Sequence, residues 1–148
     1  MRVGINASFL RKLNTGIGQV TLNFLRKVSE HSRVEYILYL EEPLPNGLDI
    51  PKHFREQVFL PWWRRDDVVR KLWWERCLVP KQAKRDGCDV FISLYQSATV
   101  MPKSIRHIMV VHDIIPKLFP EYLNNWRKRC HWQSVERGIR HADKLYAV

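Results

Sequence analysis

The chain has 148 residues, of which 45% are hydrophobic and six are tryptophans, and its formal net charge is +10 at pH 7. This length and hydrophobic content fit one domain with a sizeable core and exclude a disordered tail. The positive charge favours anionic partners, namely nucleic acid, phosphorylated substrates or an acidic membrane face.

Cysteine usage and hydropathy indicate a cellular compartment. The three cysteines, Cys77, Cys88 and Cys130, are widely spaced, show neither metal-ligand nor redox spacing, and are odd in number. We therefore expect reduced thiols in the core of a cytosolic protein. No apolar window is long enough for a signal peptide or a membrane span, so any contact with a membrane is expected to be peripheral.

Short apolar strands alternate with amphipathic helices along the chain. Strands are predicted over residues 2–6, 34–40, 57–60, 89–94, 107–112 and 144–148, and helices over 16–31, 66–84 and 124–141. Loops are predicted over 7–14, 41–55, 95–105 and 113–120. This order predicts an α/β fold in which residues 1–148 form one Rossmann-like, doubly wound parallel sheet.

Two of the helices carry signals of their ends and faces. The first is expected to bury one stripe, formed by Ile17, Val20, Phe24, Leu25 and Val28. The second is expected to start at a cap on Asp66 or Asp67, to be kinked at Pro80 and to end at Gly87.

A glycine-containing loop, Thr15-Gly16-Ile17-Gly18-Gln19, leads into the first helix. The Thr15 hydroxyl is suited to cap that helix, and the two glycines leave its first backbone N–H groups open. Such an end attracts anions and lets a ligand approach the backbone closely. The same glycines also suit a simple turn before a helix, so other residues have to decide between the two interpretations.

One function that these glycines suggest is dinucleotide binding, with Glu41 after the second strand holding a ribose. Two observations count against it. The third position after Gly18 is Thr21 where the fingerprint has glycine, and residues 7–15 separate the strand from the glycines, whereas the fingerprint needs a tight turn directly after the strand.

His112 and Asp113 follow the fifth predicted strand. In open parallel sheets, ligands bind beyond the carboxyl ends of the strands, so this pair is expected on the same edge as the glycine loop. A histidine there is suited to bind a hydroxyl or phosphate or to relay a proton. The alternative is a strand-end histidine that is satisfied by the backbone.

Tryptophan lies beside basic residues at several places. Such clusters suit anionic membrane headgroups or single-stranded nucleic acid. Trp73 and the stripe of Trp132, Val135, Ile139 and Ala142 are expected to fill core. The loop cluster has no evident core role, and we predict membrane contact for Trp62, Trp63, Arg64 and Arg65. The alternative is that one of these tryptophans fills core and the arginines form a solvated face. The six histidines show no ligand spacing, so no metal site is predicted.

With these residues in place, the chain resembles the N-terminal half of retaining GT-B glycosyltransferases (glycosyl transferases group one). The resemblance lies in short stretches in a fixed order: residues 2–10, 15–21, 74–75 with 78–80, 89–93, 110–116 and 142–148. Together these stretches extend over the whole chain.

This resemblance implies an acceptor-binding domain of an enzyme that transfers a sugar from a nucleotide-sugar to a glycan or lipid-linked acceptor, without a cofactor. It implies substrate binding by Thr15, Gly16, Ile17, Gly18 and Gln19, and catalytic roles for His112 and Asp113. Asn6 stands where the family often has aspartate, and no two glutamates have seven residues between them, as the family's C-terminal pair does.

We therefore expect the nucleotide-binding C-terminal domain to be absent from residues 1–148 and the chain alone to be inactive. The alternatives are a non-catalytic partner subunit of a two-chain transferase and an NAD(P)-binding oxidoreductase domain. A nucleic-acid-binding module ranks last, because no helix-turn-helix or stacking-sheet signature is present. The expected location is cytoplasmic, at the inner face of the cell membrane.

Overall fold

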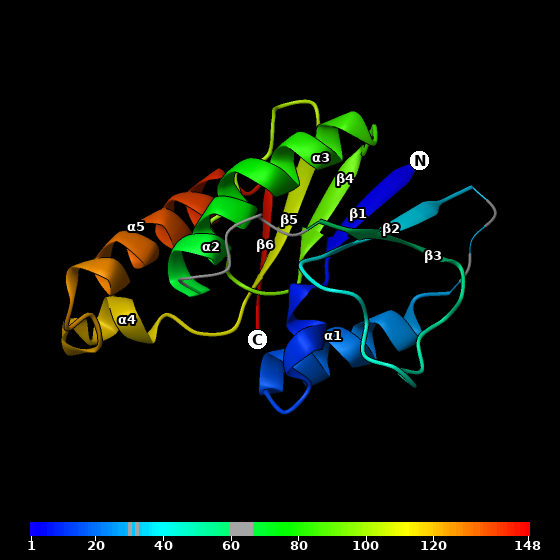
Figure 1. Cartoon of the computed structure of the whole chain (residues 1–148). Helices are drawn as coiled ribbons and strands as arrows, with labels where there is room; N and C mark the ends of the chain where they lie inside the picture. The colour runs from blue at the N-terminus through cyan, green and yellow to red at the C-terminus, as the bar shows by residue number, and fades with distance from the viewer. Residues whose placement is uncertain (30, 32, 60–66) are drawn as a thin grey trace.

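A computed structural model describes residues 1–29, 31, 33–59 and 67–148. Within this part of the chain, six parallel strands form one sheet in the order β3-β2-β1-β4-β5-β6 (Figure 1). Their bounds are β1 Arg2–Asn6, β2 Glu35–Leu40, β3 Phe54–Val58, β4 Val90–Ser93, β5 Arg106–Val111 and β6 Lys144–Ala147. The predicted Rossmann-like α/β fold is confirmed.

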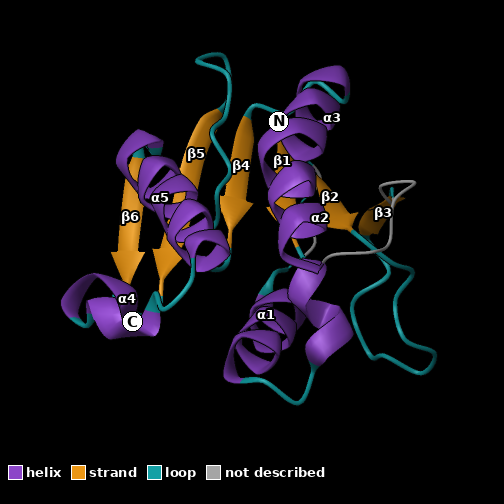
Figure 2. Cartoon of the chain, turned by 60° about the vertical axis from the view of Figure 1, so that its left-hand side comes forward, coloured by secondary structure: helices purple, strands orange, loops and turns teal. Residues whose placement is uncertain are grey.

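Helices cover both faces of this sheet. The helical elements are η1 Ser8–Lys12, α1 Gly16–Lys27, α2 Asp67–Trp73, η2 Trp74–Leu78, α3 Val79–Arg85, α4 Ile115–Leu118, η3 Pro120–Tyr122 and α5 Trp126–His141. Val3 and Ile5 of β1 pack in one core with Leu22 and Leu25 of α1. Alternate residues of β2 pack on the opposite face against Trp74, Val79 and Ala83. Figure 2 shows α2, α3 and α5 together over one face of the sheet.

The order of the strands reverses between β1 and β4. From β1 the chain first builds β2 and β3 on one side, and then returns to place β4 on the other side. Asn6 at the end of β1 is in register with Ser93 at the end of β4. In a sheet of this kind, the crevice beyond such a switch point is the usual place for a ligand.

The predicted helix over residues 66–84 is interrupted by one π-helical turn, η2. Pro80 has no N–H to give to the carbonyl of Arg76, and its ring crowds that carbonyl. The helix widens just before it, and the Val79 N–H bonds the carbonyl of Trp74, five residues back. The α-helical pattern is therefore interrupted at residues 74–78, just before the kink predicted at Pro80, and Gly87 ends the helix at φ +68°. Asp66 and the side chain of Asp67 lie outside the described residues.

Several predicted boundaries are wrong. The loop over 7–14 contains the 3-10 helix η1, and the loop over 113–120 contains α4 and begins η3. Helix α1 ends at Lys27, because Val28 has extended backbone angles. Strand β3 begins at Phe54, because the polar sequence of this edge strand, FREQV, hides its start from an apolar pattern.

The buried face of α1 also differs from the predicted stripe. Its buried residues are Gly18, Thr21, Leu22 and Leu25, whereas Val20 is exposed. The reason is the position of Gly18, which faces the backbone of Lys12 in η1. On the same side of the helix, Leu22 and Leu25 pack in the core with Val3 and Ile5.

The tryptophan and cysteine predictions need correction too. Trp73 is 52% exposed, and its neighbour Trp74 is fully buried, with its indole N–H donating to the carbonyl of Phe59 at 3.1 Å. Of the cysteines only Cys88 is buried, whereas Cys77 and Cys130 are exposed; all three are thiols. On α5, Trp132 and Val135 are buried as predicted, and Ile139 is half-buried.

We expect Gly18→Ala to destabilise the fold by about 1–3 kcal/mol, because the new methyl group would overlap the carbonyl of Lys12. Gly16→Ala is the matched control, since a Cβ at Gly16 meets no atom within 4 Å. This control should be neutral or stabilising by up to about 1 kcal/mol. Urea denaturation measures both values, and equal effects would contradict the packing role of Gly18.

Because the His107 ring is buried, we expect the free energy of unfolding of the chain to depend on pH. The ring is buried beside Ser93, with Nε2 2.9 Å from the hydroxyl oxygen, and burial lowers the pKa of His107 to about 4 from an ordinary 6.5. Between these two values the unfolded chain binds a proton that the folded chain does not. Lowering the pH from 6.5 to 4 should therefore cost stability, by up to about 3 kcal/mol.

The measurement is the free energy of unfolding against pH for the native chain and for His107→Gln, together with an NMR titration of the His107 ring. A ring that titrates near pH 6.5 in the folded chain would overturn this prediction, whether or not the variant folds.

Candidate functional site

A buried polar cluster lies at the switch point, where β1 and β4 end. The hydroxyl of Tyr95 accepts a bond from Nδ2 of Asn6 at 3.0 Å and lies 2.9 Å from Oγ of Ser8. It donates to Oε1 of Glu75 at 2.8 Å. The cluster thus joins the end of β1, the loop after β4 and the π-helical turn η2.

The Glu75 carboxylate is the charged centre of this cluster and is fully buried. Its second oxygen, Oε2, accepts a bond from the backbone N–H of Ala98 at 2.8 Å. Lys71, one turn earlier on α2, places Nζ 3.7 Å from Oε1. Both carboxylate oxygens have partners, as a buried charge requires.

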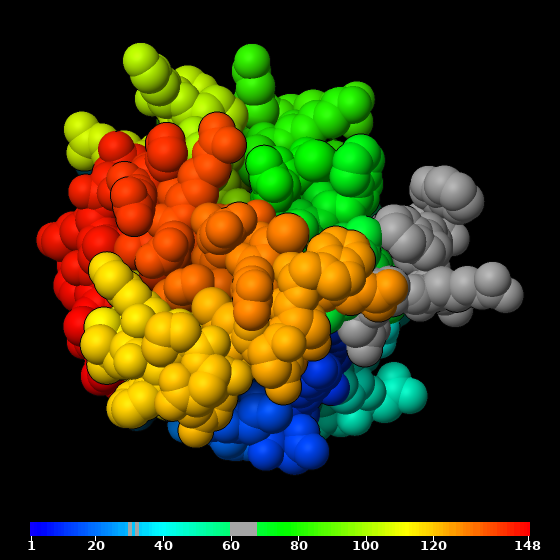
Figure 3. Space-filling view, turned by 90° about the vertical axis from the view of Figure 1, so that its left-hand side faces the viewer, coloured from blue at the N-terminus to red at the C-terminus, as the bar shows by residue number. Residues whose placement is uncertain are grey.

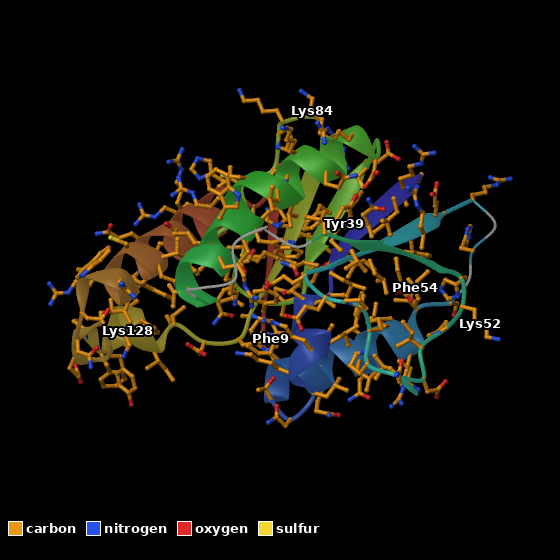
Figure 4. All side chains as sticks on the ribbon, viewed as in Figure 1. Phe9, Tyr39, Lys52, Phe54, Lys84 and Lys128 are labelled. Carbon is orange, nitrogen blue, oxygen red and sulfur yellow. The ribbon has the colours of Figure 1, made fainter. Side chains whose placement is uncertain are left out.

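Lys71 connects this cluster to the surface. Its ammonium group lies 4.4 Å from the centre of the Phe9 ring and 4.7 Å from the centre of the Tyr95 ring. Phe9 and Tyr95 themselves form an edge-to-face pair, with ring centres 4.4 Å apart. The result is an aromatic wall that carries a positive charge, and Figure 4 shows Phe9 just above α1.

A second buried carboxylate, Glu41, follows β2. It is 1% exposed, and Oε2 lies 3.4 Å from Arg70 and 3.6 Å from Arg11. Burial raises the pKa of the Glu41 carboxyl, against the opposing effect of the arginines. Among the described residues, neither oxygen of Glu41 accepts a hydrogen bond.

Two adjoining cavities open over these groups. One, of about 210 Å³, is lined by Ser8, Phe9, Arg11, Lys12, Glu41, Val68, Lys71 and His131. The other, of about 260 Å³, is lined by Phe9, Ile17, Lys71, Tyr95, Gln96, Asp113, Pro116, His131, Trp132 and Val135. Phe9, Lys71 and His131 belong to both, and burial lowers the pKa of His131.

The glycine loop meets this site at one residue, Ile17, in the wall of the larger cavity. Thr15 caps α1 as predicted, because its Oγ1 accepts from the N–H of Gly18 at 3.2 Å. Gly18 is required by the close approach of the Lys12 backbone. Gln19 turns back, and its Nε2 donates to the carbonyl of Leu13 at 2.6 Å. Of the predicted substrate-binding residues, the open position is Gly16.

His112 and Asp113 lie on the same edge of the sheet, as expected. Nε2 of His112 lies 2.8 Å from the carbonyl oxygen of Leu94. Because a carbonyl only accepts, Nε2 carries a proton, and Nδ1 is the nitrogen able to accept a bond in the neutral ring. Asp113 lines the larger cavity, and its Oδ1 accepts from the N–H of Ile115 at 3.2 Å.

The sequence interpretation missed the roles of Lys71, Glu75 and Tyr95. The one available signal was the spacing of Lys71 and Glu75, which places opposite charges one helical turn apart beside apolar residues. Trp62, Trp63, Arg64 and Arg65, predicted to contact a membrane, lie outside the described residues. Within the described ranges, acidic, histidine and cysteine side chains do not gather in groups of three that could hold a metal ion.

Comparison with known proteins finds no matching family model and no matching curated protein. In the parts of the chain that the structure describes, the helices lack the length and apolar character that crossing a bilayer requires.

Glu75→Gln should destabilise the chain by about 2–4 kcal/mol, because an amide has one oxygen for two donors and would turn its NH2 group toward one of them. Glu56→Gln, at an exposed position of β3, is the matched control and should change stability by less than about 0.5 kcal/mol. Urea denaturation of both variants measures the difference. Equal stability of the two would mean that the buried cluster contributes little to the fold.

Proposed function

We propose that this chain is the acceptor-binding, Rossmann-like domain of a GT-B retaining glycosyltransferase. One observation carries the proposal: segments that resemble that family come from separate parts of the chain and meet around one cavity. Phe9 comes from the first segment, Ile17 from the glycine loop, and Asp113 and Pro116 from the segment after β5. Glu75, from a fourth segment, holds Tyr95 in the wall of the same cavity.

The lining of the two cavities suits a sugar acceptor. The half-buried Phe9 ring, packed on the buried Tyr95 ring, offers apolar surface for the face of a sugar ring, while Gln96, Asp113 and His131 offer polar groups for its hydroxyls. Lys71 adds one positive charge between the rings. Such a mixture of aromatic walls and a few polar groups orients a ligand with many hydroxyls.

In the proposed reaction, a sugar passes from a nucleotide-sugar to the acceptor with retained configuration. Asp113 would orient the acceptor hydroxyl, and His112, whose Nε2 bonds the Leu94 carbonyl, would stabilise charge that develops on the transferring sugar. The open backbone at Gly16 would face the donor across the cleft. A second domain would hold the nucleotide, in the same polypeptide or in a partner chain, and no cofactor is required.

The NAD(P)-binding alternative is disfavoured by two features. Glu41, the candidate ribose ligand, is buried between two arginines. The 3-10 helix η1 occupies the connection where a dinucleotide fingerprint has its tight turn. The other alternative, a non-catalytic partner subunit of a two-chain transferase, would have the same site. For either kind of transferase chain, the proposed location is the cytoplasmic face of the cell membrane.

The test is NMR of the isotope-labelled chain with three sets of ligands: glycosides and oligosaccharides, nucleotide-sugars, and NAD(P)H. Glycosides should shift the amide signals of Ile17, Gln96 and Asp113 with an affinity of order 1 mM. Asp113→Asn should weaken this binding by about tenfold, because a hydrogen bond to a charged group is lost. Asp49→Asn, at an exposed loop position, is the matched control.

Two results would contradict the proposal. Saturable binding of NAD(P)H at the glycine loop would favour the oxidoreductase. Glycoside binding that leaves Ile17, Gln96 and Asp113 unshifted would separate the acceptor site from these cavities.

A further inference from the structure

An exposed apolar surface follows β5 and extends to the start of α5. Four large side chains within nine residues are about half exposed or more: Leu118 at 62%, Phe119 at 49%, Tyr122 at 60% and Trp126 at 68%. Ile114 and Ile115, directly before them, are also exposed. Soluble proteins rarely leave such a cluster of large apolar groups in water without a partner.

Basic residues surround this cluster. The positive side chains are Lys117 on α4 and Arg127, Lys128 and Arg129 on the first turn of α5, and Glu121 is the one acidic residue between positions 114 and 129. The Arg127 guanidinium lies 5.6 Å from the Trp126 ring centre, and Nε of Arg129 bonds the carbonyl of Leu123 at 3.0 Å. We call residues 114–129 the basic–aromatic surface.

The basic–aromatic surface is continuous in space. In Figure 3, α4 and η3 (yellow) lie directly against the start of α5 (orange) on one side of the molecule. The short elements α4 and η3 contact each other, since the Tyr122 N–H bonds the carbonyl of Phe119 at 3.1 Å and the two rings pack edge to face.

A third cavity, of about 300 Å³, joins this surface to the candidate site. Its lining includes Tyr122, Leu123 and Lys128 from the basic–aromatic surface. It also includes Pro116, His131 and Trp132, which line the 260 Å³ cavity as well. The basic–aromatic surface and the candidate site therefore adjoin at these three residues.

We propose that the basic–aromatic surface docks this chain on an anionic lipid bilayer. Its aromatic and aliphatic side chains would enter the interface between headgroups and acyl chains, where tryptophan and tyrosine are favoured. Its four basic residues would face anionic headgroups. Exposed aliphatic residues such as Leu118 have no counterpart in nucleic-acid binding, which uses basic and aromatic groups. Bilayer docking deepens the proposed function, on whose membrane location it rests, by naming the surface that makes the contact, and its test does not depend on sugar transfer.

Vesicle co-sedimentation tests whether docking depends on the positive charge of the basic–aromatic surface. The chain should bind vesicles that contain phosphatidylglycerol and should bind pure phosphatidylcholine vesicles at least about tenfold more weakly. Arg127→Glu with Lys128→Glu should reduce binding to the anionic vesicles by at least about tenfold. Lys81→Glu with Lys84→Glu, on α3, makes the same change in net charge and should retain binding; Figure 4 shows Lys84 and Lys128 far apart. An equal loss in both pairs would overturn the proposal, because only net charge would then matter.

The contribution of the exposed apolar side chains is tested by the double variant Leu118→Ser with Trp126→Ser. Trp73→Ser, on α2, is the matched control. The double variant should lose vesicle binding, whereas the control should keep it, and urea denaturation should show all variants folded because these side chains are exposed. Lipids brominated in the acyl chain should quench fluorescence less in Trp126→Phe than in Trp73→Phe.

Two results would refute docking on a bilayer. One is that the variant Leu118→Ser with Trp126→Ser binds vesicles as strongly as the native chain does. The other is that the variants of the basic–aromatic surface lose binding to an oligonucleotide but keep binding to vesicles. That result would assign the surface to nucleic acid. Either result would leave the glycoside test of the proposed function unaffected.

Discussion

The buried Glu75 carboxylate is the interaction on which the geometry of the switch point depends. A carboxylate removed from water is costly unless its charge is paired or its oxygens accept hydrogen bonds, and here the Tyr95 hydroxyl and the Ala98 N–H supply two such bonds. Because Tyr95 also contacts Asn6 and Ser8, the carboxylate connects η2, the end of β1 and the loop after β4. These three elements form the floor of the candidate site, and the loss of one bond would loosen all of them.

The π-helical turn before Pro80 brings this carboxylate into position. Pro80 removes a hydrogen-bond donor and crowds the preceding turn, and the helix widens over residues 74–78. Both Trp74 and Glu75 are fully buried as a result, the first in the apolar core and the second in the polar cluster. A π-turn of this kind is often found at a functional site. Here it serves packing and polar organisation together.

The cavities and the basic–aromatic surface form one side of the molecule. His131 and Trp132 of α5 line the cavity nearest the switch point and also the cavity that reaches Tyr122 and Lys128. The proposed acceptor site and the proposed bilayer contact are therefore adjacent. This arrangement would suit an acceptor whose lipid part stays in the bilayer while its sugar enters the cavity.

The sequence by itself determined the α/β class, most of the strands and the Thr15 cap, and it indicated a helix irregularity near Pro80, because each depends on local rules of periodicity, capping or proline geometry. It also placed the glycine loop and Asp113 on one edge, since parallel strands point their carboxyl ends the same way. Tertiary structure alone decided which residues form the site. Glu75 and Tyr95 are 20 positions apart, and Glu41 and Arg70 belong to different elements. Their pairing depends on how the chain returns across the sheet, which no local pattern records. The roles of Gly18 and Trp74 were likewise decided by packing, because burial depends on what lies opposite a residue in space.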